Sequence, residues 1–151
     1  MDNNKKLLAK AMKYCAYQER CSNDIKEKLV NWGAFPNDID SIINQLIDEK
    51  FIDDQRFANS YVRSKFTYNK WGKKKIFVML KQKGIDKEIA EQALNEINEE
   101  DYLQTVLNLI QKKTVKAENE FQRKQKVAAW LHSKGFEMDI IWKTLDMEDL
   151  V

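Results

Sequence analysis

Residues 76 to 85 read IFVMLKQKGI, a short amphipathic segment that ends close to a glycine. Ile76 and Leu80 are about one helical turn apart, so both fall on one face of a helix. Gly84 follows this pair at a position where a helix can end in a left-handed residue, a conformation that glycine adopts without steric penalty. The segment therefore predicts a helix over residues 73–83 that stops at Gly84.

The same pattern occurs three times in the chain, at a step of 51 residues. Gly33, Gly84 and Gly135 are each 51 residues apart. Four apolar columns follow the same step: Ile25, Ile76 and Val127; Leu29, Leu80 and Leu131; Ile39, Ala90 and Ile141; and Ile43, Leu94 and Leu145. A fixed step indicates tandem copies of one structural unit. Two-helix repeats usually run about 34 to 47 residues, so the longer step favours a unit of three helices.

Helix start signals agree with this repeat. Pro36 suits the first turn of a helix, and Ser22 and Asp53 are residue types that cap helix N-termini. We expect helices near 4–18, 23–32, 37–50, 54–68, 73–83, 87–98, 100–114, 122–134 and 138–147, and no strand, because no stretch sustains a two-residue alternation. The predicted fold is all-α, with three tandem three-helix modules at 1–51, 52–98 and 99–151 that form an elongated, curved array.

The composition excludes several protein classes. Charged residues make up 33% of the chain and hydrophobic residues 43%, with four glycines and one proline, which favours a soluble helical protein. No long apolar run or signal-peptide pattern occurs, so we expect a cytoplasmic protein without membrane contact. Cys15 and Cys21 have no CxxC spacing and no companion histidines. They therefore predict two reduced thiols rather than a disulfide or a metal site.

Positive charge is concentrated in the middle of the sequence. Residues 55–85 hold nine Lys and Arg residues and no Asp or Glu, whereas the whole chain has a net charge of +2, so the remainder carries a net −7. Like charges at helical spacing repel each other, and such a patch favours an anionic partner such as phosphate. A weaker basic stretch follows at Lys112, Lys113, Lys116, Arg123, Lys124 and Lys126, interrupted by Glu118 and Glu120.

The sequence carries no sign of catalysis. His132 is the single histidine, and no phosphate-binding glycine loop or nucleophile with a visible partner is present. Adjacent acids such as Asp53 and Asp54 point around a helix rather than toward one atom. We therefore expect a protein that is not an enzyme and that uses no cofactor and no metal.

Three ordered motifs resemble one protein family. FIDDQRFANSYV, residues 51–62, resembles the (L/I)-D-D-x-R-F-A signature of the RecX family, bacterial regulators of the RecA recombinase. Residues 70–85 are similar to that family's basic segment ending in K-G-I, and residues 126–136 are similar to its C-terminal L-x-x-(R/K)-G-F segment. Lys73 stands where the family often has proline, Trp71 is unusual at its position, and Trp130 replaces a common phenylalanine.

The resemblance implies a negative regulator that binds the RecA filament on single-stranded DNA. Such a protein lies along the filament groove and inhibits the recombinase, ATPase and coprotease activities of RecA, which modulates recombinational repair and the SOS response. The implied partners are the RecA nucleoprotein filament and single-stranded DNA, with weaker binding to duplex DNA. We expect the protein itself to be a monomer.

The candidate residues fall into a structural group and a contact group. Asp53 is expected to cap a helix, Asp54 to favour the helix dipole, Arg56 to reach back to Asp53, and Phe57 to face inward, while Gly33, Gly84 and Gly135 end helices. The predicted contacts to RecA or DNA are one aromatic residue and the surrounding cations: Arg63, Lys65, Lys70, Trp71, Lys73, Lys74, Lys75, Lys81, Lys83, Arg123, Lys124 and Lys126.

Two other functions stay open at this point. A helical DNA-binding protein that acts without RecA would also carry a basic patch, although no helix presents the Asn, Gln and Arg mixture that reads base edges. A protein-interaction scaffold with no nucleic acid nearby is the second alternative. Charge reversal at Lys73, Lys74 and Lys75 would leave the binding of such a scaffold intact.

Overall fold

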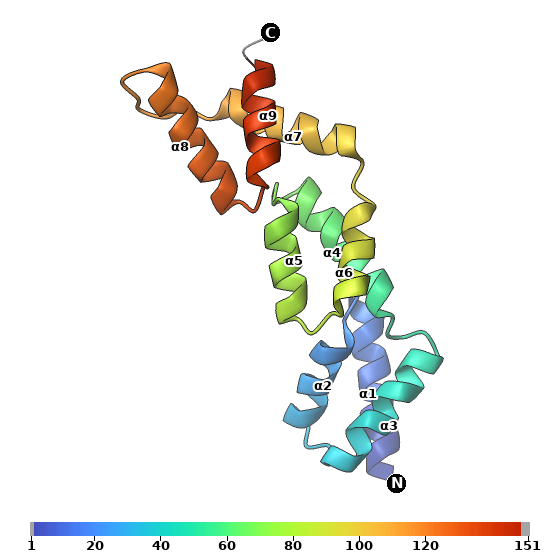
Figure 1. Cartoon of the computed structure of the whole chain (residues 1–151). Coiled ribbons are helices and arrows are strands. Elements are labelled where there is room, and N and C mark those ends of the chain that lie inside the picture. The colour runs from blue at the N-terminus through green and yellow to red at the C-terminus, as the bar shows by residue number, and fades with distance from the viewer. Residues whose placement is uncertain (1, 149–151) are drawn as a thin grey trace. The chain divides into compact units, whose positions relative to one another are not determined.

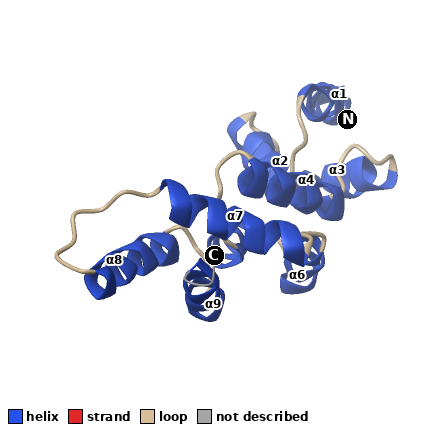
Figure 2. Cartoon of the chain, turned by 90° about the horizontal axis from the view of Figure 1, so that it is seen from above, coloured by secondary structure: helices blue, strands red, loops and turns tan. Residues whose placement is uncertain are grey.

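The computed structural model describes residues 2–148, which form nine α-helices joined by loops (Figure 1). The helices are α1 (Asp2–Tyr17), α2 (Ser22–Asn31), α3 (Pro36–Asp48), α4 (Asp54–Thr67), α5 (Lys73–Gln82), α6 (Lys87–Asn95), α7 (Glu99–Lys112), α8 (Glu120–Ser133) and α9 (Met138–Glu148). Figure 2 shows no strand in this described part of the chain. The all-helical prediction is confirmed, and every predicted helix begins and ends within three residues of an observed one.

The repeated glycines end helices as predicted. Gly33, Gly84 and Gly135 have φ angles of +87°, +82° and +97°, which lie in the left-handed region. In each case the next amide donates to a carbonyl five residues back: Ala34 to Leu29, Ile85 to Leu80 and Phe136 to Leu131, at 2.9, 3.1 and 3.2 Å. These are Schellman motifs, which satisfy carbonyl groups that a helix end would otherwise leave without partners. Pro36 lies in the first turn of α3, also as predicted.

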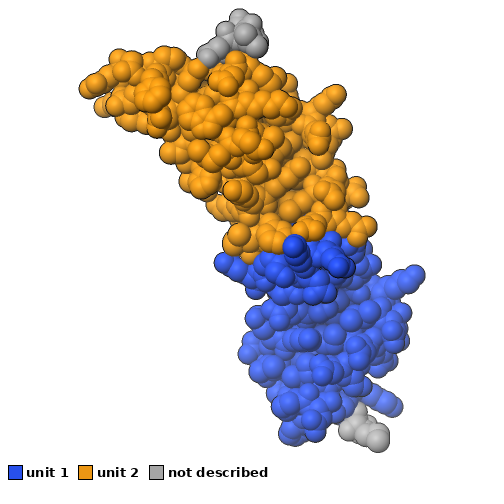
Figure 3. Space-filling model, viewed as in Figure 1, with its two compact units in different colours: residues 1–60, 80–90 blue, residues 61–79, 91–151 orange. Residues whose placement is uncertain are grey.

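The chain forms two compact units (Figure 3). The first contains residues 1–60 and 80–90, and the second contains residues 61–79 and 91–151. Helices α4, α5 and α6 contribute residues to both units, so the units do not coincide with the predicted three-helix modules. The module boundaries after residues 51 and 98 stay a prediction, as does the elongated, curved shape.

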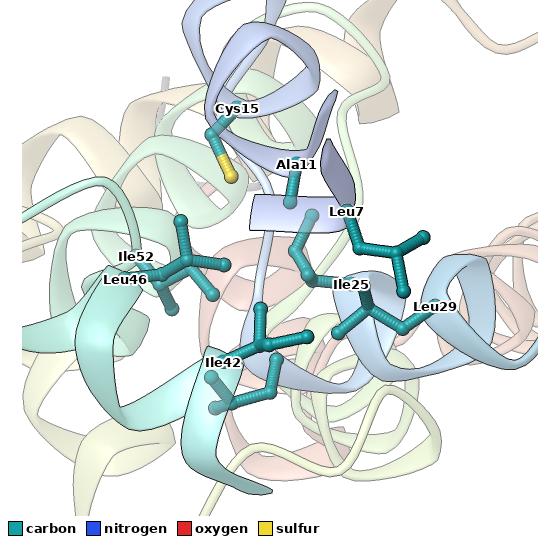
Figure 4. Packing of buried hydrophobic residues seen from close by; sticks show 9 residues of the cluster. Leu7, Ala11, Cys15, Ile25, Leu29, Ile42, Leu46 and Ile52 are labelled. Carbon is teal, nitrogen blue, oxygen red and sulfur yellow. The ribbon is translucent and has the colours of Figure 1, made fainter. Parts of the chain in front are cut away.

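The core of the first unit is formed by α1, α2 and α3 together with Ile52. Leu7, Ala11 and Cys15 lie four residues apart and form the buried face of α1. Figure 4 shows these side chains pointing toward Ile25 and Leu29 of α2 and toward Ile42 and Leu46 of α3. Trp32 packs against this cluster and meets the Tyr14 ring edge-on, with 5.9 Å between centroids.

The core of the second unit is also built from three helices, and the buried side chains of the first of them, α7, are larger than those of α1. Tyr102, Val106 and Ile110 form the buried face of α7 and pack against residues of α8 and α9, namely Val127, Ala128, Leu131, Ile141 and Leu145, and against Phe136. Trp130 and Trp142 are half-buried against this cluster. The interpretation of Trp32, Trp130 and Trp142 as packing residues is confirmed.

The acidic signature at the start of α4 has structural roles, with two corrections. Asp53 caps α4 as predicted, because its Oδ1 accepts the Arg56 amide at 3.0 Å, and Phe57 is buried. The predicted cap at Ser22 is wrong: the Ser22 amide itself donates to Oδ1 of Asp54 at 2.8 Å. The Arg56 guanidinium also does not reach back to Asp53. It donates from Nε to both carboxylate oxygens of Glu19, at 3.0 and 2.9 Å.

Candidate nucleic-acid interface

The loop between α4 and α5 lies directly against the turn between α8 and α9, within the second unit. The Gly72 amide donates to the Lys134 carbonyl at 2.8 Å, and the Lys74 amide donates to the Gly135 carbonyl at 3.0 Å. A β-carbon on Gly72 would lie 2.3 Å from the carbonyl carbon of Gly135 and 2.3 Å from the amide nitrogen of Phe136. Glycine is therefore required here for close backbone approach, and the contact joins segments that are about 60 residues apart in sequence.

Tyr102 completes this junction from α7. The Lys73 amide, at the start of α5, donates to the Tyr102 hydroxyl at 3.0 Å, and the hydroxyl donates to Oε1 of Glu137. Burial raises the pKa of Tyr102 above its usual range, and the hydrogen bond with Glu137 adds to this shift. The Lys73 ammonium lies 4.7 Å from the centroid of the same ring. Both ends of Lys73 are thus held against Tyr102.

Two lysine ammonium groups lie against the Trp71 ring beside this junction. The Nζ atoms of Lys65 and Lys75 are 4.9 and 4.5 Å from the ring centroid. These distances lie within the range of about 6 Å at which a cation is attracted to an aromatic face. Trp71, Lys65 and Lys75 are all half-buried, so the ring and the two lysine stems pack as one group.

A second aromatic residue carries two further lysines. The Nζ atoms of Lys113 and Lys134 lie 4.5 and 5.5 Å from the Trp130 ring centroid. Lys134 also donates to the Asn69 carbonyl at 3.4 Å. Burial lowers the pKa of Lys134, and the charges of Lys75 and Lys113 lower it further. Lys134 directly precedes Gly135, whose carbonyl accepts the Lys74 amide, so the segments that carry Lys134 and Lys75 lie side by side.

We call these six residues the cationic cluster: Lys65, Trp71, Lys75, Lys113, Trp130 and Lys134. Within residues 2–148 none of its four lysines forms an ion pair with a carboxylate. A cluster of like charges without a counter-charge has unfavourable internal repulsion, which an external anion would relieve. The cluster thus combines unneutralised cations with two aromatic side chains.

The other predicted contact residues are distributed between the two units. Arg63, Lys70 and Lys74 are exposed in the second unit. Lys81 and Lys83 belong to the first unit, where Lys83 lies 3.8 Å from a carboxylate oxygen of Asp24. Lys126, which is exposed, donates to the Lys116 carbonyl, and Lys124 is half-buried.

Arg123 is already bound by two carboxylates. Its NH2 nitrogen lies 2.6 Å from an oxygen of Glu120 and 2.6 Å from an oxygen of Glu148. Hydrogen bonds to these two acids raise the pKa of Arg123. Its charge is therefore largely neutralised within the chain, in contrast to the lysines of the cationic cluster.

The sequence predictions missed Trp130 and Lys134 as members of this surface and placed Lys113 only in a weaker basic stretch. These residues join Trp71 because Gly72 packs against the turn at Gly135. A signal existed in the repeat, since Lys134 follows Lys83 by 51 residues and directly precedes the repeated glycine. His132, by contrast, is exposed on α8.

The arrangement is suited to binding a single-stranded nucleic acid. Lysines can contact backbone phosphates while an aromatic ring offers a face for an unpaired base, and this combination is typical of single-strand binding surfaces. Among the described residues no group of three or more His, Cys, Asp or Glu side chains could hold a metal ion. None of the described helices combines the length and the apolar character that crossing a membrane requires.

Comparisons with known proteins identify the family. Residues 53–94 match the family model of the second three-helix domain of RecX, and residues 99–145 match that of the third. The regulatory protein RecX of Prosthecochloris aestuarii is 32% identical, and the match covers 95% of this chain and 94% of the relative. The regulatory protein RecX of Bacillus licheniformis is 30% identical over 98% of this chain. Here the chain spans only 57% of the relative's length.

Solved structures agree with these matches in sequence and in fold. The crystal structure of RecX from Lactobacillus salivarius superposes with a TM-score of 0.90 at 30% sequence identity, covering 99% of both chains. A second crystal structure, of a regulatory protein RecX, superposes with a TM-score of 0.85 at 28% identity over 96% of this chain and 72% of that one. The resemblance seen in the three sequence motifs is therefore confirmed, and the chain belongs to the RecX family of regulatory proteins.

Proposed function

We propose that this protein is a negative regulator of RecA that binds the RecA filament on single-stranded DNA. It inhibits the recombinase, ATPase and coprotease activities of RecA and so modulates recombinational repair and the SOS response. Membership of the RecX family supports RecA as the partner. The single structural observation that supports contact with the filament is the cationic cluster, whose four lysines and two tryptophans have no carboxylate partner among residues 2–148.

The cluster supports a mechanism based on binding alone. Lysines attract the phosphates of the single strand and release counterions from it, so the affinity should fall steeply with salt concentration. If all four lysines of the cluster contact phosphates, the logarithm of the binding constant falls with the logarithm of the salt concentration at a slope of about −3. Trp71 and Trp130 add stacking surfaces for unpaired bases, which duplex DNA cannot offer without unstacking. The proposal therefore includes weaker binding to duplex DNA, and it requires no catalytic group, cofactor or metal.

The same cluster also supports a second candidate, a helical DNA-binding protein that acts without RecA. The two candidates differ in how they would slow RecA. A DNA-binding protein alone would slow RecA only by competing for DNA, and excess DNA would remove its effect. A filament regulator would act at DNA concentrations that saturate RecA and at amounts of protein well below the number of free DNA sites.

The proposal is tested by the DNA-dependent ATPase of RecA with the wild-type protein and two variants. The first variant replaces three cluster residues, Lys65→Gln, Trp71→Ala and Lys75→Gln. The second is a matched control, Lys143→Gln, which removes an exposed lysine of α9 in the same unit. We expect the wild type and the control to lower the ATPase rate equally and the triple variant to lower it weakly. No change in the RecA ATPase with the wild-type protein would refute the proposed function, and full inhibition by the triple variant would remove the cluster from it.

A further inference from the structure

A small pocket opens beside the residue that precedes Trp71. It is lined by Lys70, Thr105, Asn108, Leu109 and Lys112 and has a volume of about 80 Å³. Four of these residues come from α7 at spacings of three and four, so they share one face of that helix. Lys70 comes from the loop between α4 and α5. All five residues belong to the second unit.

The polar groups that line the pocket are hydrogen-bond donors. Lys70 and Lys112 are both exposed and supply two ammonium groups. The side-chain oxygen of Asn108 accepts a hydrogen bond from Gln104 at 2.9 Å, which leaves the NH2 group of Asn108 to donate elsewhere. The Thr105 hydroxyl makes no hydrogen bond within the described residues, and the lining contains no Asp or Glu. The pocket therefore has the chemistry of an anion site.

The internal repeat provides a comparison within the same chain. Lys70 follows Glu19 by 51 residues, and both residues lie in the loop after the first helix of a helix triplet. In the first unit Glu19 is neutralised by Arg56 of α4 through two hydrogen bonds, at 3.0 and 2.9 Å. In the second unit the equivalent loop position holds a lysine, Lys70, and the residue 51 positions after Arg56 is the uncharged Leu107. The loop charge of the first copy is thus paired with the next helix, whereas Lys70 forms no ion pair among the described residues.

We propose that this pocket binds one backbone phosphate of single-stranded DNA, an inference that rests on the filament binding proposed above. A volume of about 80 Å³ exceeds the roughly 30 Å³ that one water molecule occupies in the liquid, so there is room for a small oxyanion. Two cations, a hydroxyl and an amide can together satisfy several oxygens of a phosphate. Trp71 is the next residue after Lys70, so a phosphate held here has a base-stacking side chain on the neighbouring residue.

The conformation of Lys70 allows a variant that separates folding from binding. Lys70 has a φ angle of +57°, in the left-handed region that favours glycine. Replacement Lys70→Gly therefore removes the ammonium group while it relieves the backbone. We expect this variant to melt at the same temperature as the wild type or higher, and to bind DNA more weakly. A loss of binding could then not be attributed to unfolding.

The test measures the binding of labelled oligo-dT by fluorescence anisotropy in the absence of RecA. Because charge-assisted hydrogen bonds are among the stronger polar contacts, we expect Lys70→Gly and Lys112→Gln each to weaken binding by about fivefold or more. Loss of one phosphate contact should also make the log–log salt slope less steep by about 0.7. The Lys143→Gln control should retain both the affinity and the slope. Wild-type affinity and slope in both pocket variants would overturn the assignment.

Competition experiments identify the source of the phosphate. We expect unlabelled oligo-dT to displace the label at micromolar concentration, and inorganic phosphate or ATP to do so only where their ionic strength accounts for the effect. Displacement by inorganic phosphate or ATP as effectively as by the oligonucleotide would make the pocket a site for free phosphates and overturn the backbone assignment. The ATPase assay above keeps the two proposals apart. Weakened DNA binding by the pocket variants, together with no effect of the wild type on RecA, would retain the pocket and refute the proposed function.

Discussion

Replacement of Gly72 by alanine should separate the loop before α5 from the turn after α8. The new β-carbon would lie 2.3 Å from two backbone atoms, the carbonyl carbon of Gly135 and the amide nitrogen of Phe136. Neither atom can rotate away as a side chain could, so the two segments must move apart by about 1 Å to reach an ordinary contact distance. This movement breaks or lengthens the two hydrogen bonds that the Gly72 and Lys74 amides donate across the junction.

The size of the effect follows from these contacts. Two hydrogen bonds contribute about 0.5–1.5 kcal/mol each to the free energy of unfolding. Overpacking of a tight contact typically costs a further 1–3 kcal/mol. We therefore expect Gly72→Ala to lower the free energy of unfolding by about 2–6 kcal/mol. The variant should also weaken DNA binding, because this junction brings Trp130 and Lys134 to the other members of the cationic cluster.

The assay is urea denaturation followed by circular dichroism, with Gly33→Ala as the matched control. Gly33 also ends a helix, with a φ angle of +87°, but a β-carbon there would meet nothing within 4 Å. The free energy of unfolding of the control should therefore fall by only about 1–2 kcal/mol, which is the cost of an alanine in the left-handed region. The control should keep its DNA affinity. A Gly72→Ala variant as stable as the wild type, or one with unchanged DNA affinity, would refute the account of this junction.

Three further predictions concern the first unit and the shape of the protein. Lys50 ends α3 with a φ angle of +64°, so Lys50→Gly should raise the free energy of unfolding by about 1 kcal/mol, and a lower urea midpoint would contradict this. Burial raises the pKa of Cys21 from 9.0 to about 11, so the unfolded chain releases this proton first and stability should fall as the pH rises from 9 to 11. The fall in the urea midpoint should be smaller in Cys21→Ala, and an equal fall in both proteins would exclude the thiol as its source. The elongated array that the sequence predicts would have a radius of gyration clearly above the roughly 15 Å of a compact chain of this length, which solution scattering can measure, and a value near 15 Å would contradict that prediction.

The helices and their ends could be predicted from the sequence because their causes are local. The apolar spacing and the glycine that follows it lie within about ten residues, and the repeat supplies three examples of the same signal. The predicted cap at Ser22 failed for the opposite reason. The partner of the Ser22 amide is Asp54, 32 residues away, and the partner of the Arg56 guanidinium is Glu19, 37 residues away. Such contacts depend on the packing of one helix triplet on the next, which a local pattern does not contain.

The candidate site could be predicted only in part, for the same reason. The basic stretch at residues 55–85 predicted contacts at Trp71 and its neighbouring lysines, and in the structure Lys65 and Lys75 lie against that ring. Trp130 and Lys134 belong to a helix and a turn about 60 residues later and carry no signal of this role in their own segment. The ion pair of Lys83 with Asp24 also lies outside what the basic stretch indicates, and the contact predicted at Lys83 stays a prediction.

Co-sedimentation with RecA filaments tests the central claim most directly. The wild-type protein, the triple variant of the cationic cluster and the Lys143→Gln control are each centrifuged with RecA on single-stranded DNA and a slowly hydrolysed nucleotide, with RecA alone, and with DNA alone. We predict that the wild type and the control sediment with the filament more completely than with RecA alone or DNA alone, and that the triple variant stays largely in the supernatant. Equal sedimentation of the wild type with DNA in the presence and absence of RecA would contradict the claim that the filament is its target.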